Sequence, residues 1–163
     1  MGDRDWTTDD RSAIVDVVTR YAVTIDLRDW DGFGSCFADE VELLLVSTGG
    51  RLVFSRERIV DYARRTFSNY DATQHISANH QVTVDGDRAT CISTLNATHY
   101  VANEPGGPLQ RQFGYYRYEL VRGSGWRISR VEQMLSWQDG NQEIFDRAHL
   151  DVGLPDASDE LSK

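Results

Sequence analysis

The chain has few cysteines, a shortage of positive charge and no long apolar run. Its 163 residues include two cysteines, Cys36 and Cys91, with no CxxC pair and no His/Cys cluster. This argues against a disulfide framework or a zinc site and favours two buried free thiols in a reducing compartment. No apolar run approaches the roughly 18 residues of a transmembrane helix, and the N-terminus lacks the layout of a signal peptide. We therefore expect a cytoplasmic protein.

The shortage of positive charge argues against polyanions as binding partners. Lys and Arg number 17 against 26 Asp and Glu, which gives a net charge of −9. Nucleic-acid backbones and anionic membrane surfaces both require a positive footprint on the protein, so neither is an expected partner. Part of the acidic excess lies at the two ends, in "GDRDWTTDD" and "LPDASDELSK". These ends are predicted to be solvated, the second as an acidic tail from about residue 150.

The common cofactor and nucleophile motifs are also absent. The sequence has no GxGxxG, no Walker loop, no HExxH and no GxSxG elbow. The "GSG" at Gly123–Gly125 falls in a predicted hairpin turn and is not a phosphate cradle. His75 and His80 are close in sequence, but on a regular strand they would face opposite ways. We expect neither a cofactor nor a metal.

What the sequence does contain is a set of helical segments followed by strand segments. Apolar spacing predicts helices within residues 7–30, 29–40 and 55–67, strands at 41–46, 76–84, 88–102, 109–121 and 126–137, and a last helix at Gln142–His149. No repeat or low-complexity linker interrupts the pattern, so one domain is predicted over residues 1–163, with its core at about 8–138. Helices followed by an antiparallel meander predict an α+β fold, in which a strongly curved sheet wraps over the helices.

Asp26 interrupts an apolar helix face. It lies one turn after Ala22 and two turns after Val18, on the same ridge of the first predicted helix. A buried carboxylate is costly unless it finds a partner, so Asp26 either has one or lies where the apolar face ends and caps the next turn. Tyr21 lies on the same face, and its hydroxyl needs a partner if it is buried.

Three histidines fall on predicted strands. Alternation puts His99 on the core face of residues 88–102, where it is either a hydrogen-bonded core residue or part of a pocket wall. His75 falls on a polar face with Ser77 and Asn79, whereas His80 falls among apolar residues. The polar face lines a cavity, lies in solvent, or changes sides at a bulge, and the pattern leaves all three open.

These residues carry a resemblance to a known family. The segments "RYAVTIDLRDWDGFGSCFADEV", "TQHISANHQVTVDGDRAT" and "GWRIS" resemble the SnoaL-like branch of the nuclear-transport-factor-two-like superfamily, over roughly residues 8–138. The resemblance implies a cone-shaped roll with the N-terminal helices in the concavity of a mainly antiparallel sheet. The element from His75 to Asn79 is similar to that of dehydratases and dehydrochlorinases, including the bile-acid dehydratase and lindane dehydrochlorinase types.

The resemblance also implies roles for residues. In such relatives an aspartate at the end of the first helix orients a histidine base, and Asp26 and His75 match that pair. Tyr21 matches the tyrosine of the bile-acid dehydratase type, and His99 is similar to the second histidine of scytalone dehydratase. The arginine with which some dehydrochlorinases receive the leaving group would be Arg117 or Arg130, with no motif to choose between them.

The expected function is that of a cofactor-independent lyase acting on a small to medium, apolar, cyclic metabolite. His75 would remove a proton from the carbon next to a carbonyl. Tyr21 or His99 would donate a hydrogen bond to the developing enolate or protonate the departing hydroxyl. An isomerase or a polyketide cyclase would use the same pair. The alternative of another class is a non-catalytic ligand-binding or dimerisation module. Aromatic residues on the exposed side of "FGYYRYEL" predict a homo-oligomer, as a dimer through the sheet.

Overall fold

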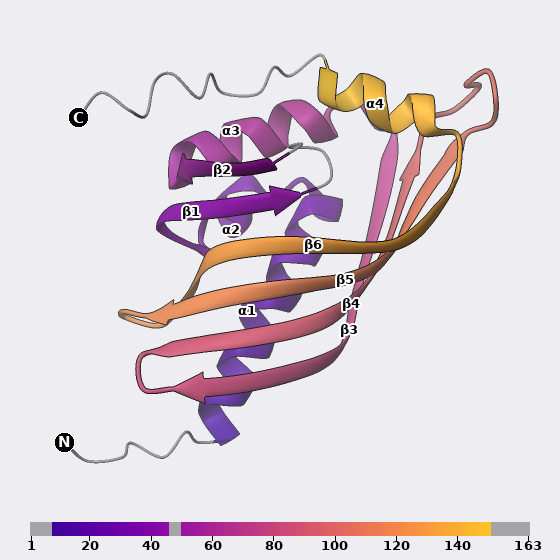
Figure 1. The fold of residues 1–163 in the computed structure, drawn as a ribbon. Helices are drawn as coiled ribbons and strands as arrows, with labels where there is room; N and C mark the ends of the chain where they lie inside the picture. The colour runs from indigo at the N-terminus through magenta and orange to yellow at the C-terminus, as the bar shows by residue number, and fades with distance from the viewer. Residues whose placement is uncertain (1–7, 46–49, 151–163) are drawn as a thin grey trace.

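The computed structural model describes residues 8–45 and 50–150 as helices packed in the concavity of one curved sheet (Figure 1). The helices are α1 (Thr8–Leu27), α2 (Trp30–Gly34), α3 (Arg56–Phe67) and α4 (Gln142–Leu150). The strands are β1 (Phe37–Leu45), β2 (Gly50–Ser55), β3 (Ala72–Asp85), β4 (Arg88–Tyr100), β5 (Leu109–Arg122) and β6 (Trp126–Gly140). Their order is β2-β1-β6-β5-β4-β3, antiparallel throughout except for the parallel pair β1 and β6. The predicted α+β cone fold is confirmed.

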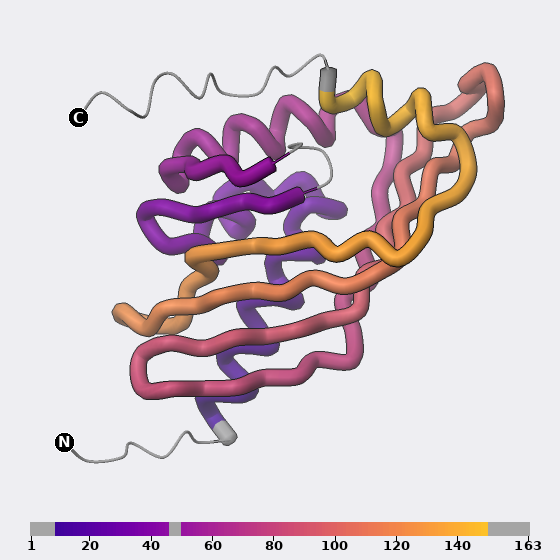
Figure 2. Tube along the Cα trace, in the orientation of Figure 1, coloured from indigo at the N-terminus to yellow at the C-terminus, as the bar shows by residue number. Residues whose placement is uncertain are grey.

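The long strands β3 to β6 bend together toward α4, as the trace in Figure 2 shows. Two bulges accompany this bend, one in β3 between Ala78 and Gln81 and one in β6, where Ser136 is the extra residue opposite Phe113 and Gly114 of β5. A bulge inserts a residue into one strand, kinks it and increases its twist. At Gly114 the backbone of β6 approaches so closely that a Cβ atom would overlap the carbonyl oxygen of Met134. The curvature therefore depends on glycine at this position.

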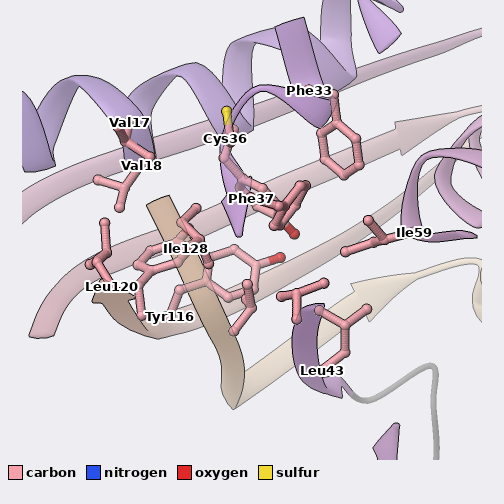
Figure 3. Close-up of a cluster of buried hydrophobic side chains, with 14 of the residues drawn as sticks. Val17, Val18, Phe33, Cys36, Phe37, Leu43, Ile59, Tyr116, Leu120 and Ile128 are labelled. Carbon is pink, nitrogen blue, oxygen red and sulfur yellow. The ribbon is translucent and has the colours of Figure 1, made fainter. Parts of the chain in front are cut away.

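The core lies between α1, α2, α3 and the concave face of the sheet. Helix α1 buries one continuous face against the strands, including Ile14, Val18, Tyr21 and Ile25. Figure 3 shows part of this cluster, in which Phe33 of α2 lies with Phe37, Tyr116 and Ile128 of the sheet. Cys36 and Cys91 are both buried free thiols, as predicted.

The structure corrects two details of the predicted elements. Strand β1 begins at Phe37 rather than Val41, and β2 was not predicted. Only Phe54 is buried among the β2 residues, because this strand lies at the edge of the sheet and carries little of the alternation that marks a strand. The parallel pairing of β1 with β6 joins segments far apart in the sequence, so a meander alone does not predict it.

Helix α4 matches the predicted helix at Gln142–His149 to within one residue. The predicted acidic tail, residues 151–163, lies outside the described residues, as do residues 1–7. Within the described ranges, no helix combines the length and apolar character needed to cross a membrane.

We expect Gly114→Ala to lower the free energy of unfolding by roughly 1–3 kcal/mol, because its Cβ would force β6 away from β5. Denaturant unfolding measures the change. The control is Gly123→Ala in the turn between the same two strands, where a Cβ meets nothing within 4 Å. That variant should change stability by less than about 0.5 kcal/mol. Equal stabilities for the two variants would show that the close approach at Gly114 does not constrain the sheet.

Candidate active site

A pocket lies between the concave face of the sheet and helices α1, α3 and α4. Most of its wall is apolar or aromatic, and its polar side chains come mainly from β3, β4, β5, β6 and α4. The lining residues are Tyr21, Ile25, Phe33, Leu43, Leu45, Ile59, Tyr62, Ala63, Thr66, Phe67, His75, His99, Gln112, Tyr116, Gln133, Phe145 and His149. No Asp, Glu, Lys or Arg stands among these described lining residues. Such a pocket suits an uncharged ligand.

Asp26 and His75 form a direct pair at the edge of this pocket. The Nδ1 atom of His75 lies 2.7 Å from Oδ1 of Asp26, and the backbone amide of His75 donates to Oδ2 at 2.7 Å. Thr73 adds a third donor, from its hydroxyl to Oδ1 at 2.9 Å. The carboxylate therefore requires the proton of His75 on Nδ1, which leaves Nε2 as the free ring nitrogen.

The bulge in β3 explains how His75 comes to face inward. Before the bulge Thr73, His75 and Ser77 lie on the inner side, and after it His80 and Val82 do. Asn79 adopts the left-handed conformation, with φ of 54°, where the register changes. A bulge that changes the strand's sides was one of the three alternatives left open by the sequence, and it is confirmed. Both histidines thus face inward, but only His75 lines the pocket.

The environment of Asp26 favours its charged form. Burial alone would raise the pKa of the Asp26 carboxyl, but the hydrogen bonds and charge of His75, together with Thr73, outweigh it and lower the pKa. The His75 side chain is 5% exposed and that of Asp26 is 20% exposed, so neither group is strongly screened by solvent.

His99 lies beside His75, with 5.7 Å between the ring centroids, but its environment is different. Its Nδ1 donates to Oε1 of Gln110 at 2.8 Å, and the ring packs against Tyr70 and Phe67. Burial, assisted by the charge of His75, lowers the pKa of His99 to about 3. His99 is therefore neutral near pH 7.

Tyr21 lines the same pocket and packs edge-on against Phe37 and Tyr116. Burial, with a contribution from Tyr116, raises the pKa of Tyr21 well above its usual value. Its hydroxyl therefore keeps its proton and can act as a hydrogen-bond donor. Of the four predicted residues, Tyr21, His75 and His99 line this pocket, and Asp26 lies behind His75 as its hydrogen-bond partner.

Several polar residues of the pocket were not singled out from the sequence. Gln112 is 2% exposed, its Oε1 accepts from Gln133 Nε2 at 2.9 Å, and its own Nε2 has no hydrogen-bond partner among the described residues. Gln112 shares the inner face of β5 with Tyr116, so a polar residue on an apolar face was the available signal. His149 from α4 also lines the pocket and donates from Nδ1 to the Phe145 carbonyl at 2.8 Å.

Neither candidate arginine lies in the pocket, so that suggestion is wrong. Arg117 alternates with the buried Tyr116 and Tyr118 and therefore points to the opposite face of the sheet. Arg117 and Arg130 both lie within 4 Å of Glu119 and Glu132 in a network of ion pairs. Charged residues on the solvent side of a strand need no ligand to explain them.

The described residues also contain no group of three or more His, Cys, Asp or Glu side chains arranged to hold a metal ion. The polar groups of the pocket are thus hydrogen-bonding groups and histidines. These groups can transfer protons and form hydrogen bonds.

Comparison with known proteins agrees with this fold and pocket. The model of the SnoaL-like domain matches residues 6–132, most of the chain. The chain belongs to the SnoaL-like domain family. The predicted family resemblance is confirmed.

Relatives of this SnoaL-like protein come from fungi and bacteria. Terrestric acid biosynthesis cluster protein E of Penicillium crustosum is 25% identical over 143 residues, which cover 83% of this chain and 89% of that protein. The crystal structure of the Kfla4162 protein from Kribbella flavida has a TM-score of 0.77 and 27% identity, over 84% of this chain and 97% of that chain. A hexachlorocyclohexane dehydrochlorinase, LinA type 2, has a TM-score of 0.70 and 20% identity, over 80% and 88% of the two chains. The last similarity shows the shared fold.

We expect His99 to make stability depend on pH. Its pKa is about 3 in the folded protein, against roughly 6.5 in the unfolded chain, so between these values the unfolded chain holds the extra proton. The free energy of unfolding should then fall as pH falls, by up to about 1.4 kcal/mol per pH unit from this group. Denaturant unfolding of wild type and His99→Gln between pH 7 and 4 measures the difference.

The comparison with the variant is needed because burial also lowers the pKa of His80 and His149, which act in the same direction. The wild-type curve should be steeper than that of His99→Gln. Parallel curves would mean that His99 is protonated in the folded protein.

Proposed function

We propose that this protein is a cofactor-independent lyase of the dehydratase type. Its substrate is a small to medium, apolar, cyclic metabolite, and the Asp26–His75 pair removes a proton from carbon. The single observation that carries the proposal is the 2.7 Å contact between His75 Nδ1 and Asp26 Oδ1 at the wall of a largely apolar pocket. A histidine oriented by a carboxylate is a standard general base, and it contributes roughly 10²–10⁴-fold to the rate.

The reaction has two steps. His75 Nε2 takes the proton from the carbon next to a carbonyl, and the electron pair of that C–H bond moves toward the carbonyl oxygen as an enolate. The enolate then re-forms the carbonyl and makes a C=C bond as the C–O bond to the β-hydroxyl breaks. The hydroxyl leaves as water with the proton that His75 removed from carbon, either directly or by way of Tyr21, which then recovers a proton from His75. His75 is neutral again, and one substrate gives one unsaturated product and one water.

The electrostatics of the pocket favour Tyr21 over His99 as the donor in this reaction. The Tyr21 hydroxyl keeps its proton because burial raises its pKa, with a contribution from a hydrogen bond to Tyr116. Turning this hydroxyl from Tyr116 to the substrate would let it donate to the enolate oxygen or to the departing hydroxyl. His99 has a pKa of about 3, and its Nδ1 proton is engaged by Gln110. It is therefore a poor acid, and we assign it a role in shaping the pocket beside His75.

The lining of the pocket supports an uncharged substrate. It offers aromatic and aliphatic walls and the partnerless Nε2 of Gln112, and its described residues include no fixed charge to neutralise a carboxylate or a phosphate. The names of two similar proteins agree with an elimination reaction on a metabolite. LinA is a dehydrochlorinase, which is an elimination enzyme, and the Penicillium protein belongs to a biosynthetic cluster.

The test is a panel of neutral cyclic β-hydroxy ketones incubated with the protein in D₂O. We expect deuterium to enter the carbon next to the carbonyl, by NMR, and an absorbance band of the conjugated enone to appear. His75→Gln should lose roughly 10²–10⁴-fold of the rate, and Asp26→Asn a comparable part. His80→Gln, on the same strand but outside the pocket lining, is the matched control and should keep the rate.

The outcomes separate the alternatives. Deuterium exchange without an enone favours an isomerase or cyclase with the same base. Saturable binding of the ketones without exchange would overturn the catalytic proposal in favour of a ligand-binding module. Equal loss in His75→Gln and His80→Gln would remove His75 as the base.

We also propose that the protein forms a homodimer through the outer face of the sheet. Ile76, Tyr115 and Trp137 are 48%, 42% and 53% exposed there, and Trp137 stacks on Phe113 at 3.8 Å. The pairing places Ile76 opposite Asn96, Asn96 opposite Phe113 and Phe113 opposite Trp137, so this row crosses four strands and is apolar on three of them, β3, β5 and β6. Such a row suits the matching surface of a second copy.

Light scattering should therefore give twice the mass of one chain, which is 18.5 kDa. Trp137→Lys should shift the mass toward that of one chain at micromolar concentration, because it places a charge within the apolar row. The control is Arg51→Lys, on β2 and away from this row. A wild-type mass near 18.5 kDa would refute the dimer.

A further inference from the structure

Helix α1 ends with an arginine where glycine is the usual residue. The backbone amide of Arg28 donates to Ile25 O at 3.1 Å and that of Asp29 donates to Thr24 O at 2.9 Å, which is the Schellman ending of a helix. This ending needs a left-handed residue, and Arg28 has φ of 58°. Glycine adopts that conformation without a steric penalty, whereas arginine does not. A residue that breaks a local rule in this way is often retained for its side chain.

The side chain of Arg28 reaches back to the Asp26–His75 pair. Its Nη1 donates to the carbonyl of Ile25 at 2.7 Å and to the hydroxyl of Thr73 at 3.0 Å. The guanidinium also lies over the ring of Phe67, 5.7 Å from its centroid. Phe67 in turn packs edge-on against His75. Arg28 is therefore linked to Asp26 through Thr73 and to His75 through Phe67.

The donors and acceptors fix the direction of this chain of hydrogen bonds. A guanidinium can only donate, so the Thr73 oxygen accepts from Arg28. The single hydroxyl proton of Thr73 is then directed to Oδ1 of Asp26, 2.9 Å away. The same Oδ1 receives the Nδ1 proton of His75, while Oδ2 receives the backbone amide of His75. The carboxylate is thereby held by donors on both oxygens.

We propose that Arg28 and Thr73 are positioning residues that hold the Asp26 carboxylate ionised and oriented toward His75. The sequence places arginine at a glycine position because the guanidinium, through Thr73, completes this arrangement. The structural part of the proposal stands on contacts alone, and only its effect on turnover rests on the proposed lyase function.

Three titratable side chains of the described residues interact electrostatically with Asp26. They are Arg28 at the end of α1, His75 on β3 and His99 on β4. His99 is neutral above about pH 3, and Tyr70 interacts with Arg28 rather than with the carboxylate. Titration of Asp26 therefore reports mainly on Arg28, Thr73 and His75.

The test compares Arg28→Gly, Thr73→Val and Arg28→Lys by ¹³C NMR titration of the Asp26 carboxyl, with the melting temperature measured on the same samples. Arg28→Gly and Thr73→Val should each raise the titration midpoint of Asp26, since each removes a group that favours the carboxylate. Arg28→Lys keeps the charge and should lie between wild type and Arg28→Gly. Glycine relieves the left-handed backbone, which should offset part of the stability lost with the contacts of Arg28.

Asn103→Gly is the matched control. Asn103 also has a left-handed backbone, with φ of 57°, but lies in the loop between β4 and β5. Its replacement should leave the Asp26 midpoint unchanged. If the midpoint is also unchanged in Arg28→Gly and Thr73→Val, Arg28 serves only to end the helix and the proposal is overturned.

The NMR readout needs no substrate, so it separates this proposal from the lyase proposal. A shifted midpoint in a protein that eliminates nothing supports the positioning chain and rejects the lyase. With a substrate, Arg28→Gly should lower kcat about tenfold with little change in KM, and Arg28→Lys should restore part of it. A change in KM alone would place Arg28 in substrate binding and contradict its positioning role.

Discussion

The arrangement of the pocket depends on one largely buried carboxylate and its need for donors. An ionised carboxylate away from water is unstable unless hydrogen bonds replace its hydration. Asp26 obtains three from two residues of β3, Thr73 and His75, over distances of 2.7–2.9 Å. The end of α1 must therefore lie against the beginning of β3. Because β3 is an edge strand of the sheet, this contact also fixes how the helix crosses the concave face.

The bulge in β3 lets the strand face the pocket with His75 and the core with its later residues. A regular β3 with His75 inward would turn Val82 and Val84 outward, since alternation has a period of two. The extra residue near Asn79 lets the first part of the strand present Thr73 and His75 to the pocket while the later part presents valines to the core. In β5 the alternation stays regular, so Gln112 and Tyr116 both face inward, and the bulge opposite Gly114 lies in β6. Polar pocket and apolar core thus occupy successive stretches of the same strands.

The sequence predicted the fold better than the site, for physical reasons that differ between residues. Helical spacing and alternation identified α1, α3, α4 and the four long strands because each buries a continuous face. Asp26 and His99 were detectable as polar residues on such faces. His75 was not, because the bulge reverses the alternation around it, and only the family resemblance selected it over His80. Arg117 and Arg130 were misplaced because a charge on the outer side of a strand leaves no mark in the pattern that separates an ion pair from a ligand-binding group.

The two neighbouring histidines of the pocket have different hydrogen-bond partners, and we assign them different roles. His75 and His99 have ring centroids 5.7 Å apart and line the same cavity. His75 donates to a carboxylate, which stabilises an imidazolium, whereas His99 donates to the carboxamide of Gln110, which carries no charge. Two imidazoliums at this separation would repel each other in a medium of low dielectric constant. Burial keeps His99 neutral even though its hydrogen bond to Gln110 favours the charged form, so no second positive charge stands beside the proposed base.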